Sequence, residues 1–180
     1  MKSKALWLTQ TAVMMAALIT LQALTKSLGQ IVTGSCVNAI LAVTVLFVGM
    51  SSGITVAMLS PIFAFALGIA PQVLTVPAIM IGNTVFVVLL RLISGDLKTI
   101  WKSAVALLVA AVCKFQVLYI LVTFVICGLL AEQLLAQGLL KTPMLTALPV
   151  TFSFPQLITA LIGGTLAMII VPLLKKALHK

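Results

Sequence analysis

Residues 28–67 read LGQIVTGSCVNAILAVTVLFVGMSSGITVAMLSPIFAFAL, and this stretch decides the fold that we expect. It begins with glycine and small polar residues, becomes an apolar helix, turns at residues 49–53, and continues as a second apolar segment that carries the pair Ser60 and Pro61. Polar groups buried in an apolar medium cost free energy unless they are paired. The stretch therefore predicts helices that present hydrogen-bonding groups at the mouth of a site buried in lipid.

Composition supports a membrane location. Hydrophobic residues make up 63% of the 180 residues and charged residues 7%, and the mean hydropathy is +1.33, whereas about a quarter of a typical soluble chain is charged. Several apolar runs reach the roughly 20 residues that cross about 30 Å of hydrocarbon. Because these runs are continuous rather than alternating, they predict helices rather than β-strands. We expect an all-α integral membrane protein.

Six transmembrane helices in a single domain over residues 1–180 are predicted, with approximate bounds 5–24, 35–48, 54–67, 78–93, 103–130 and 155–174. Residues 49–53 form a tight connection, and a short interfacial helix is expected near residues 132–140. In the first helix Ala12, Ala16 and Thr20 recur every four residues, which gives one face so little bulk that another helix can approach closely. That helix belongs either to this chain or to a partner subunit.

Basic residues predict the orientation. Six spans place both termini and the 2–3 and 4–5 connections on one side, which collects eight lysine and arginine residues against two on the other. The eight are Lys2, Lys4, Arg91, Lys98, Lys102, Lys175, Lys176 and Lys180, and the two are Lys26 and Lys141. Since basic residues favour cytoplasmic connections, we expect cytoplasmic termini. Charges at the ends of apolar segments suit lipid headgroups, so the formal net charge of +9 does not indicate nucleic-acid binding.

Catalytic and metal-binding chemistry have little support. The two carboxylates, Asp96 and Glu132, fall on opposite sides of the membrane, and Cys36, Cys113 and Cys127 lack the spacing of metal ligands, which favours simple packing roles. We expect no metal and no cofactor.

The one catalytic arrangement that the residues could supply is a Ser–Lys dyad of Lys114 with Ser35, Ser60 or Ser153, and no spacing favours it. The absence of a Walker A motif indicates that this chain does not itself hydrolyse ATP. We expect a protein that is not an enzyme.

Uncharged polar residues instead gather in the apolar segments, mostly at their outer ends. They are Gln30, Thr33, Ser35 and Asn38 in the second helix, Ser60 in the third, Asn83 in the fourth, Gln116, Tyr119 and Thr123 in the fifth, and Thr151, Ser153, Gln156 and Thr159 around the start of the sixth. Such groups either satisfy one another between helices or bind a ligand. We favour a ligand site for the outer cluster as a set.

Among the residues of the apolar segments, Lys114 has the largest free-energy cost of burial in the membrane. It lies about eleven residues, or roughly 16 Å, inside the fifth predicted helix, where a charge costs about 2.5 kcal/mol or more. It either reaches the cytoplasmic interface, bonds to backbone carbonyls as a neutral amine, or meets an anionic ligand or partner. At 100° per residue Lys114 is about 160° from Gln116, so the two cannot both face one cavity directly. A cavity-facing Lys114 favours a ligand that bears a carboxylate, and otherwise a neutral heterocycle is more natural.

The residues together carry a resemblance to a known family. The small-residue face at Ala12 and Ala16, the entry LGQIVTGSCVNA, the segment LSPIFAFALGIAP and the start FSFPQLITALIGG of the last helix resemble the substrate-binding (S) components of energy-coupling factor (ECF) transporters over essentially the whole chain. The chain departs from a thiamine-binding pattern, because it has few of the acidic and aromatic residues that would line a pocket for a thiamine-like cation.

The resemblance implies a substrate-binding subunit in the plasma membrane of a prokaryote, which takes up a vitamin or similar micronutrient. Its implied partners are a transmembrane coupling subunit, docked at Ala12 and Ala16, and two cytoplasmic ATPase subunits. Ligand contacts in the outer loops and outer helix halves are implied as well. The candidate substrate-binding residues are therefore Gln30, Thr33, Ser35, Asn38, Asn83, Lys114, Gln116, Tyr119, Ser153, Gln156 and Thr159. The competing hypothesis is a scaffold subunit without a ligand.

Overall fold

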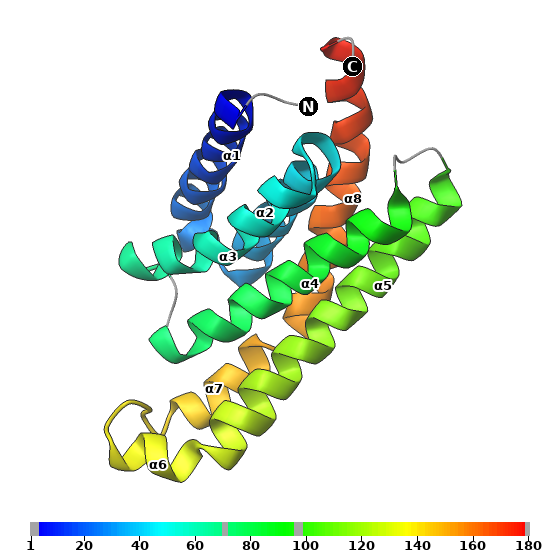
Figure 1. The fold of residues 1–180 in the computed structure, drawn as a ribbon. Helices are drawn as coiled ribbons and strands as arrows, with labels where there is room; N and C mark the ends of the chain where they lie inside the picture. Colours follow the sequence, from blue (N-terminus) through cyan, green and yellow to red (C-terminus); the bar gives the residue numbers. More distant parts are fainter. Residues whose placement is uncertain (1–3, 70–71, 96–98, 179–180) are drawn as a thin grey trace.

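A computed structural model of the chain describes residues 4–69, 72–95 and 99–178, and these residues contain helices and connections but no strand (Figure 1). The α-helices are α1 (Lys4–Thr25), α2 (Gln30–Val43), α3 (Met50–Ala66), α4 (Val76–Ser94), α5 (Ile100–Tyr119), α6 (Ala131–Ala136), α7 (Met144–Thr151) and α8 (Phe154–Ala177). Helix α2 continues as a π-helix over Thr44–Val48 and α5 over Ile120–Leu129, while Lys26–Leu28 and Val73–Thr75 are short 3₁₀ turns. The prediction of an all-α protein is confirmed for the described residues.

Five helical segments are long and apolar enough to cross a membrane, and α3 is a sixth, shorter apolar helix of 17 residues. The five are Lys4–Leu28, Gln30–Val48, Val73–Ser94, Ile100–Leu129 and Met144–Ala177. Large apolar side chains on their outer faces are exposed, including Leu8, Phe124 and Leu173. Such an apolar exterior suits contact with lipid. The architecture is that of a multi-pass membrane protein.

Helix α2 lies at the centre of the bundle and packs against α8 and α1, while α4 packs against α5 and α3. The core residues Leu41, Ala42 and Val45 of α2 and its π-helical continuation are fully buried. The close approach of α8 depends on Gly163, because a Cβ there would lie 2.5 Å from the carbonyl oxygen of Ser35 in α2. Small residues let helix backbones approach each other in membrane bundles, so Gly163 sets the α2–α8 distance.

The structure differs from the predicted bounds at the turn between α2 and α3. Gly49 makes the connection alone with a φ of 137°, and α3 begins at Met50, so Ser51 and Ser52 belong to the helix rather than to a turn. Both serines bind α1: Trp7 Nε1 donates to Ser51 Oγ at 3.0 Å, and the hydroxyls of Thr11 and Ser52 lie 2.8 Å apart. The two serines therefore fasten α3 to α1.

Two other bounds also differ from the prediction. Helix α2 begins at Gln30, five residues before the predicted start at Ser35, because Gly29 with a φ of 89° ends the preceding turn. The segment after α5 holds two short helices, α6 and α7, where one helix over residues 132–140 was expected.

A cap formed by α6, α7 and their connections covers one end of the bundle, opposite the end where α1 begins and α8 finishes (Figure 1). Leu140, Leu148 and Phe152 of the cap are buried against Leu118 and Val122 of the α5 segment. Gln72, in the connection between α3 and α4, donates to the carbonyl oxygen of Leu139 at 2.5 Å. This hydrogen bond joins the α3–α4 connection to the segment between α6 and α7, and so it fastens the cap to the bundle.

Candidate functional site

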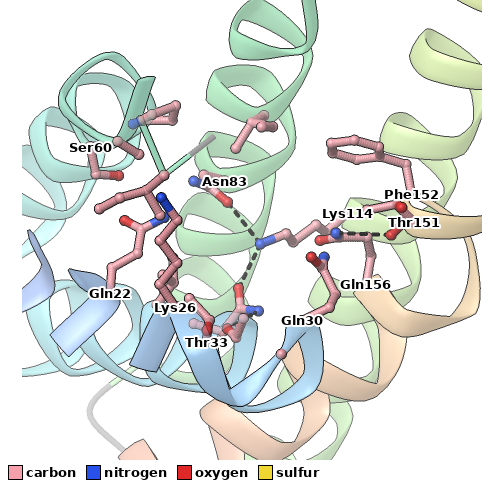
Figure 2. Close-up of a pocket in the computed structure, with 18 residues that line it drawn as sticks. Gln22, Lys26, Gln30, Thr33, Ser60, Asn83, Lys114, Thr151, Phe152 and Gln156 are labelled. Carbon is pink, nitrogen blue, oxygen red and sulfur yellow. Dashed lines mark hydrogen bonds between the residues drawn. The ribbon is translucent and has the colours of Figure 1, made fainter. Parts of the chain in front are cut away.

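A cavity of about 190 Å³ lies among α1, α2, α3, α4 and α5, next to the start of α8. Its lining contains two lysines, five side-chain amides and three hydroxyls, and no carboxylate (Figure 2). The polar members are Gln22, Lys26, Gln30, Thr33, Asn38, Ser60, Asn83, Lys114, Thr151 and Gln156; the rest are Gly29, Gly34, Val37, Pro61, Ala64, Ile69, Ile79 and Phe152. A polar, basic pocket is thus enclosed by an apolar bundle.

Lys114 points from α5 into this pocket between two asparagines (Figure 2). Its Nζ donates to Asn38 Oδ1 at 2.5 Å and to Asn83 Oδ1 at 2.7 Å, and only 2% of the residue is exposed. The ring centroid of Phe86 lies 5.4 Å from the same Nζ, within the roughly 6 Å over which an aromatic face attracts a cation. Two amide oxygens and a ring face are partners that suit an ammonium group.

The Asn38 side chain is fixed on both of its sides. Its Nδ2 donates to the carbonyl oxygen of Gly34 at 2.9 Å and to Thr159 Oγ1 at 3.2 Å, which leaves Oδ1 directed at Lys114. Thr159 in turn donates to the carbonyl oxygen of Gln156 at 3.2 Å. Because both N–H groups of the amide are used, its orientation is determined before any ligand arrives. The site is preorganised from α2, α5 and α8 together.

The mouth of the pocket is formed by the connection between α1 and α2. Lys26 Nζ donates to the carbonyl oxygen of Gly68 at 2.6 Å, which joins the α1–α2 connection to the end of α3. Thr33 Oγ1 donates to the carbonyl oxygen of Thr25 at 2.7 Å. Gln30 is exposed at this mouth, whereas Asn38 lies two turns deeper and is buried. Polar groups thus lead from the surface to the buried Lys114.

Ser60 and Pro61 belong to the wall on α3. The Ser60 side chain is 2% exposed, and its Oγ has no hydrogen-bond partner among the described residues. Pro61 has no N–H, so the helix hydrogen bond that this position would normally make is missing beside the pocket. A buried hydroxyl without a partner is costly. The residue that carries this hydroxyl belongs to the lining of the cavity.

Several of the predicted site residues meet in the pocket, and others do not. Gln30, Thr33, Asn38, Asn83, Lys114 and Gln156 line it. Thr159 lies behind Asn38 and holds it, while Ser35 is buried next to α8 without lining the cavity. Ser153 does not line the cavity either, and its Oγ donates to the carbonyl oxygen of Val150 at 2.8 Å.

Gln116 and Tyr119 lie away from the pocket, as the 160° offset from Lys114 requires for Gln116. Gln116 is exposed, and the Tyr119 ring contacts Phe115 at 5.9 Å and Phe124 at 5.7 Å between centroids. The 160° offset alone does not decide which side of the helix faces a cavity, and in the structure it is the Lys114 side.

Gln22, Lys26 and Phe152 line the cavity but were not predicted as ligand-binding residues, while Ser60 and Thr151, which also line it, belonged to the predicted polar cluster but not to the candidate list. Gln22 and Lys26 are four residues apart at the end of the first apolar run, a spacing that places two polar side chains on one helix face. That spacing was the available signal. The sequence around Phe152 contains no such signal, because Phe152 reaches the cavity only through the way α7 packs against the rest of the bundle.

Other reactive groups do not form a second centre. Cys36, Cys113 and Cys127 are free thiols of intermediate exposure. Across residues 4–69, 72–95 and 99–178, no three His, Cys, Asp or Glu side chains come close enough to hold a metal ion. Asp96, Lys2, Lys98 and Lys180, named in the sequence analysis, lie outside the described residues, as does the one histidine, His179.

Comparison with known proteins gives no match: no protein family, curated protein or solved structure resembles the chain significantly.

Proposed function

We propose that this chain is the substrate-binding subunit of an ATP-driven importer of the ECF type, which captures a vitamin or similar small micronutrient from outside the cell. The observation that carries the proposal is the polar pocket around Lys114 inside an apolar helical bundle. Buried polar groups are costly unless they have a use or a partner, and intramembrane ionisable residues mark substrate pathways in many membrane proteins. A preorganised pocket of this kind suits ligand capture better than scaffolding.

The proposed topology has six spans, including the short α3, with both termini in the cytoplasm of a prokaryotic cell. The start of α1 and the end of α8 lie at the same end of the bundle (Figure 1). Among the described basic residues, Lys4, Arg91, Lys102, Lys175 and Lys176 are assigned to that side, against Lys26 and Lys141 on the other, in line with the positive-inside tendency. The mouth of the pocket near Lys26 then opens to the exterior.

Transport would combine capture by this subunit with energy from its partners. The substrate enters at the α1–α2 connection and is bound by amide, hydroxyl and ammonium groups. A coupling subunit and two cytoplasmic ATPases then drive the change in accessibility that delivers the substrate to the cytoplasm. This chain contributes binding and no catalytic step. Lys114 donates to asparagine oxygens rather than to a serine, an arrangement that does not favour a Ser–Lys enzyme.

The outer face of α1 is where we place the coupling subunit. Ala12, Ala16 and Thr20 are exposed, so this small-residue face is not covered by the described helices of the chain. Packing of this face against another described helix of the same chain is not observed, which supports the proposal that a partner helix docks here.

Changing Ala12 and Ala16 together to leucine should abolish co-purification of the coupling subunit, because the added side chains prevent close helix approach. Binding of the ligand should be unchanged, since neither residue lines the pocket. The complex recovered on an affinity-tagged chain measures the effect, and Val13→Leu on the same helix is the matched control. Normal assembly of the double variant would show that the partner docks elsewhere.

Asn38→Ala and Gln156→Ala separate a binding subunit from a scaffold. A binding subunit should lose uptake in both variants while remaining folded and assembled, because the amides line the pocket without holding the main core. A scaffold should lose only stability. Uptake by whole cells, together with the thermal midpoint of each purified variant, distinguishes the two results. Unaltered uptake in both variants would contradict the proposed function.

A further inference from the structure

The polar pocket has an unbalanced charge. Lys114 and Lys26 both contribute to its lining, and the lining contains no carboxylate. Among the described residues the one carboxylate side chain is Glu132, which is exposed on α6. A buried ammonium normally has a counter-ion, and its burial is costly without one. The protein itself supplies amide oxygens to Lys114 but no negative charge.

The geometry around Lys114 also leaves hydrogen-bonding capacity for a ligand. An ammonium group has three N–H donors, and Asn38 and Asn83 accept two of them. Charge-assisted hydrogen bonds from an ammonium to a carboxylate are roughly twice as strong as neutral ones. An anionic acceptor in the cavity would satisfy the remaining N–H of Lys114.

The volume limits the size of the ligand. The cavity measures about 190 Å³, whereas pockets for drug-sized ligands span roughly 300–1,000 Å³. The amides of Gln22, Gln30 and Gln156 surround the remaining space and can bind hydroxyl, amide or ring-nitrogen groups. We propose that the pocket binds a small organic carboxylate whose carboxylate group accepts a hydrogen bond from Lys114. This inference rests on the proposed function and specifies its substrate class.

The test uses the full-length chain in detergent and a protein-free extract of small molecules from bacterial cells, separated on a strong anion-exchange resin. The retained, anionic fraction should raise the thermal midpoint of the protein by several degrees, and the flow-through should not. The shift should survive treatment of the fraction with phosphatase and disappear after its carboxylates are esterified. In Lys114→Gln the fraction should be needed at a concentration at least tenfold higher, whereas Lys102→Gln, at an exposed position on α5, should behave as wild type.

Each other outcome overturns the inference in a distinguishable way. Stabilisation by the flow-through fraction alone would mean a neutral or cationic ligand, which leaves the proposed transport function intact. Loss of the shift after phosphatase treatment would mean a phosphate ester. Stabilisation by neither fraction would contradict the proposed function itself, and with it the proposal that the ligand is a carboxylate.

Discussion

Replacing Lys114 with methionine is expected to lower the affinity for the ligand by roughly 30-fold to 4,000-fold and to leave the helical bundle folded. Removing one partner of a buried, hydrogen-bonded charge pair costs about 2–5 kcal/mol, and about 1.4 kcal/mol corresponds to a factor of ten. Methionine is unbranched and adapts to irregular spaces. Asn38 and Asn83 would keep water in the cavity as a donor to their oxygens.

The affinity change is measured by titrating the variant with the small molecule released from wild-type protein that was purified from its own host. The thermal midpoint of the ligand-free variant should stay close to that of the wild type, because the substitution removes a costly buried charge. Lys102→Met supplies the control, since Lys102 is exposed on the same helix. Equal affinity of Lys114→Met and wild type would remove Lys114 from the binding site.

Adding a single methyl group at Gly163 is expected to destabilise the protein more than the same change at its neighbour. The new Cβ would lie 2.5 Å from the Ser35 carbonyl oxygen, 2.6 Å from the Ala39 nitrogen and 2.7 Å from Asn38 Cβ. Two of these contacts are with the backbone of α2, which cannot move without separating the helices. Overpacking of a core costs about 1–3 kcal/mol, and occasionally more, so Gly163→Ala should lower both stability and ligand affinity through the shift of Asn38.

Gly164→Ala is the matched control, because a Cβ at Gly164 would first meet Leu107 Cδ1, the end of a flexible side chain that can rotate away. Its loss of stability should be less than half of that in Gly163→Ala, and its affinity for the ligand should be close to wild type. Thermal unfolding in detergent, followed by tryptophan fluorescence, provides the comparison. Equal losses in the two variants would contradict the role assigned to Gly163.

Much of the fold followed from hydropathy, because every span must satisfy its backbone in lipid and long apolar runs therefore become helices. The ends of elements were harder to place. Ser51 and Ser52 were read as a turn because they are small and polar, yet their hydroxyls bind Trp7 and Thr11 of α1 within the bundle. Such contacts between distant residues are not visible in a local pattern.

Helix α7 was not predicted, because only one short helix, near residues 132–140, was expected in this segment. Pro143 occupies the position just before α7, where a missing N–H costs nothing, and Pro149 lies close to the end of the helix. In the candidate site, helical periodicity correctly implied that Lys114 and Gln116 could not share a cavity, but it could not choose between them. Which of the two residues faces the cavity depends on the rotation of α5 about its own axis, and the packing of α5 against α4 sets that rotation.

Native mass spectrometry of the complex isolated from its own host tests the central claim most directly. The wild-type chain should carry a coupling subunit, two ATPase subunits and one small molecule. The Lys114→Met variant should retain the protein partners and lose the small molecule, whereas the Ala12→Leu, Ala16→Leu variant should retain the small molecule and lose the partners. A wild-type chain that carries neither a small molecule nor an ATPase would contradict its assignment as the substrate-binding subunit of an ATP-driven importer.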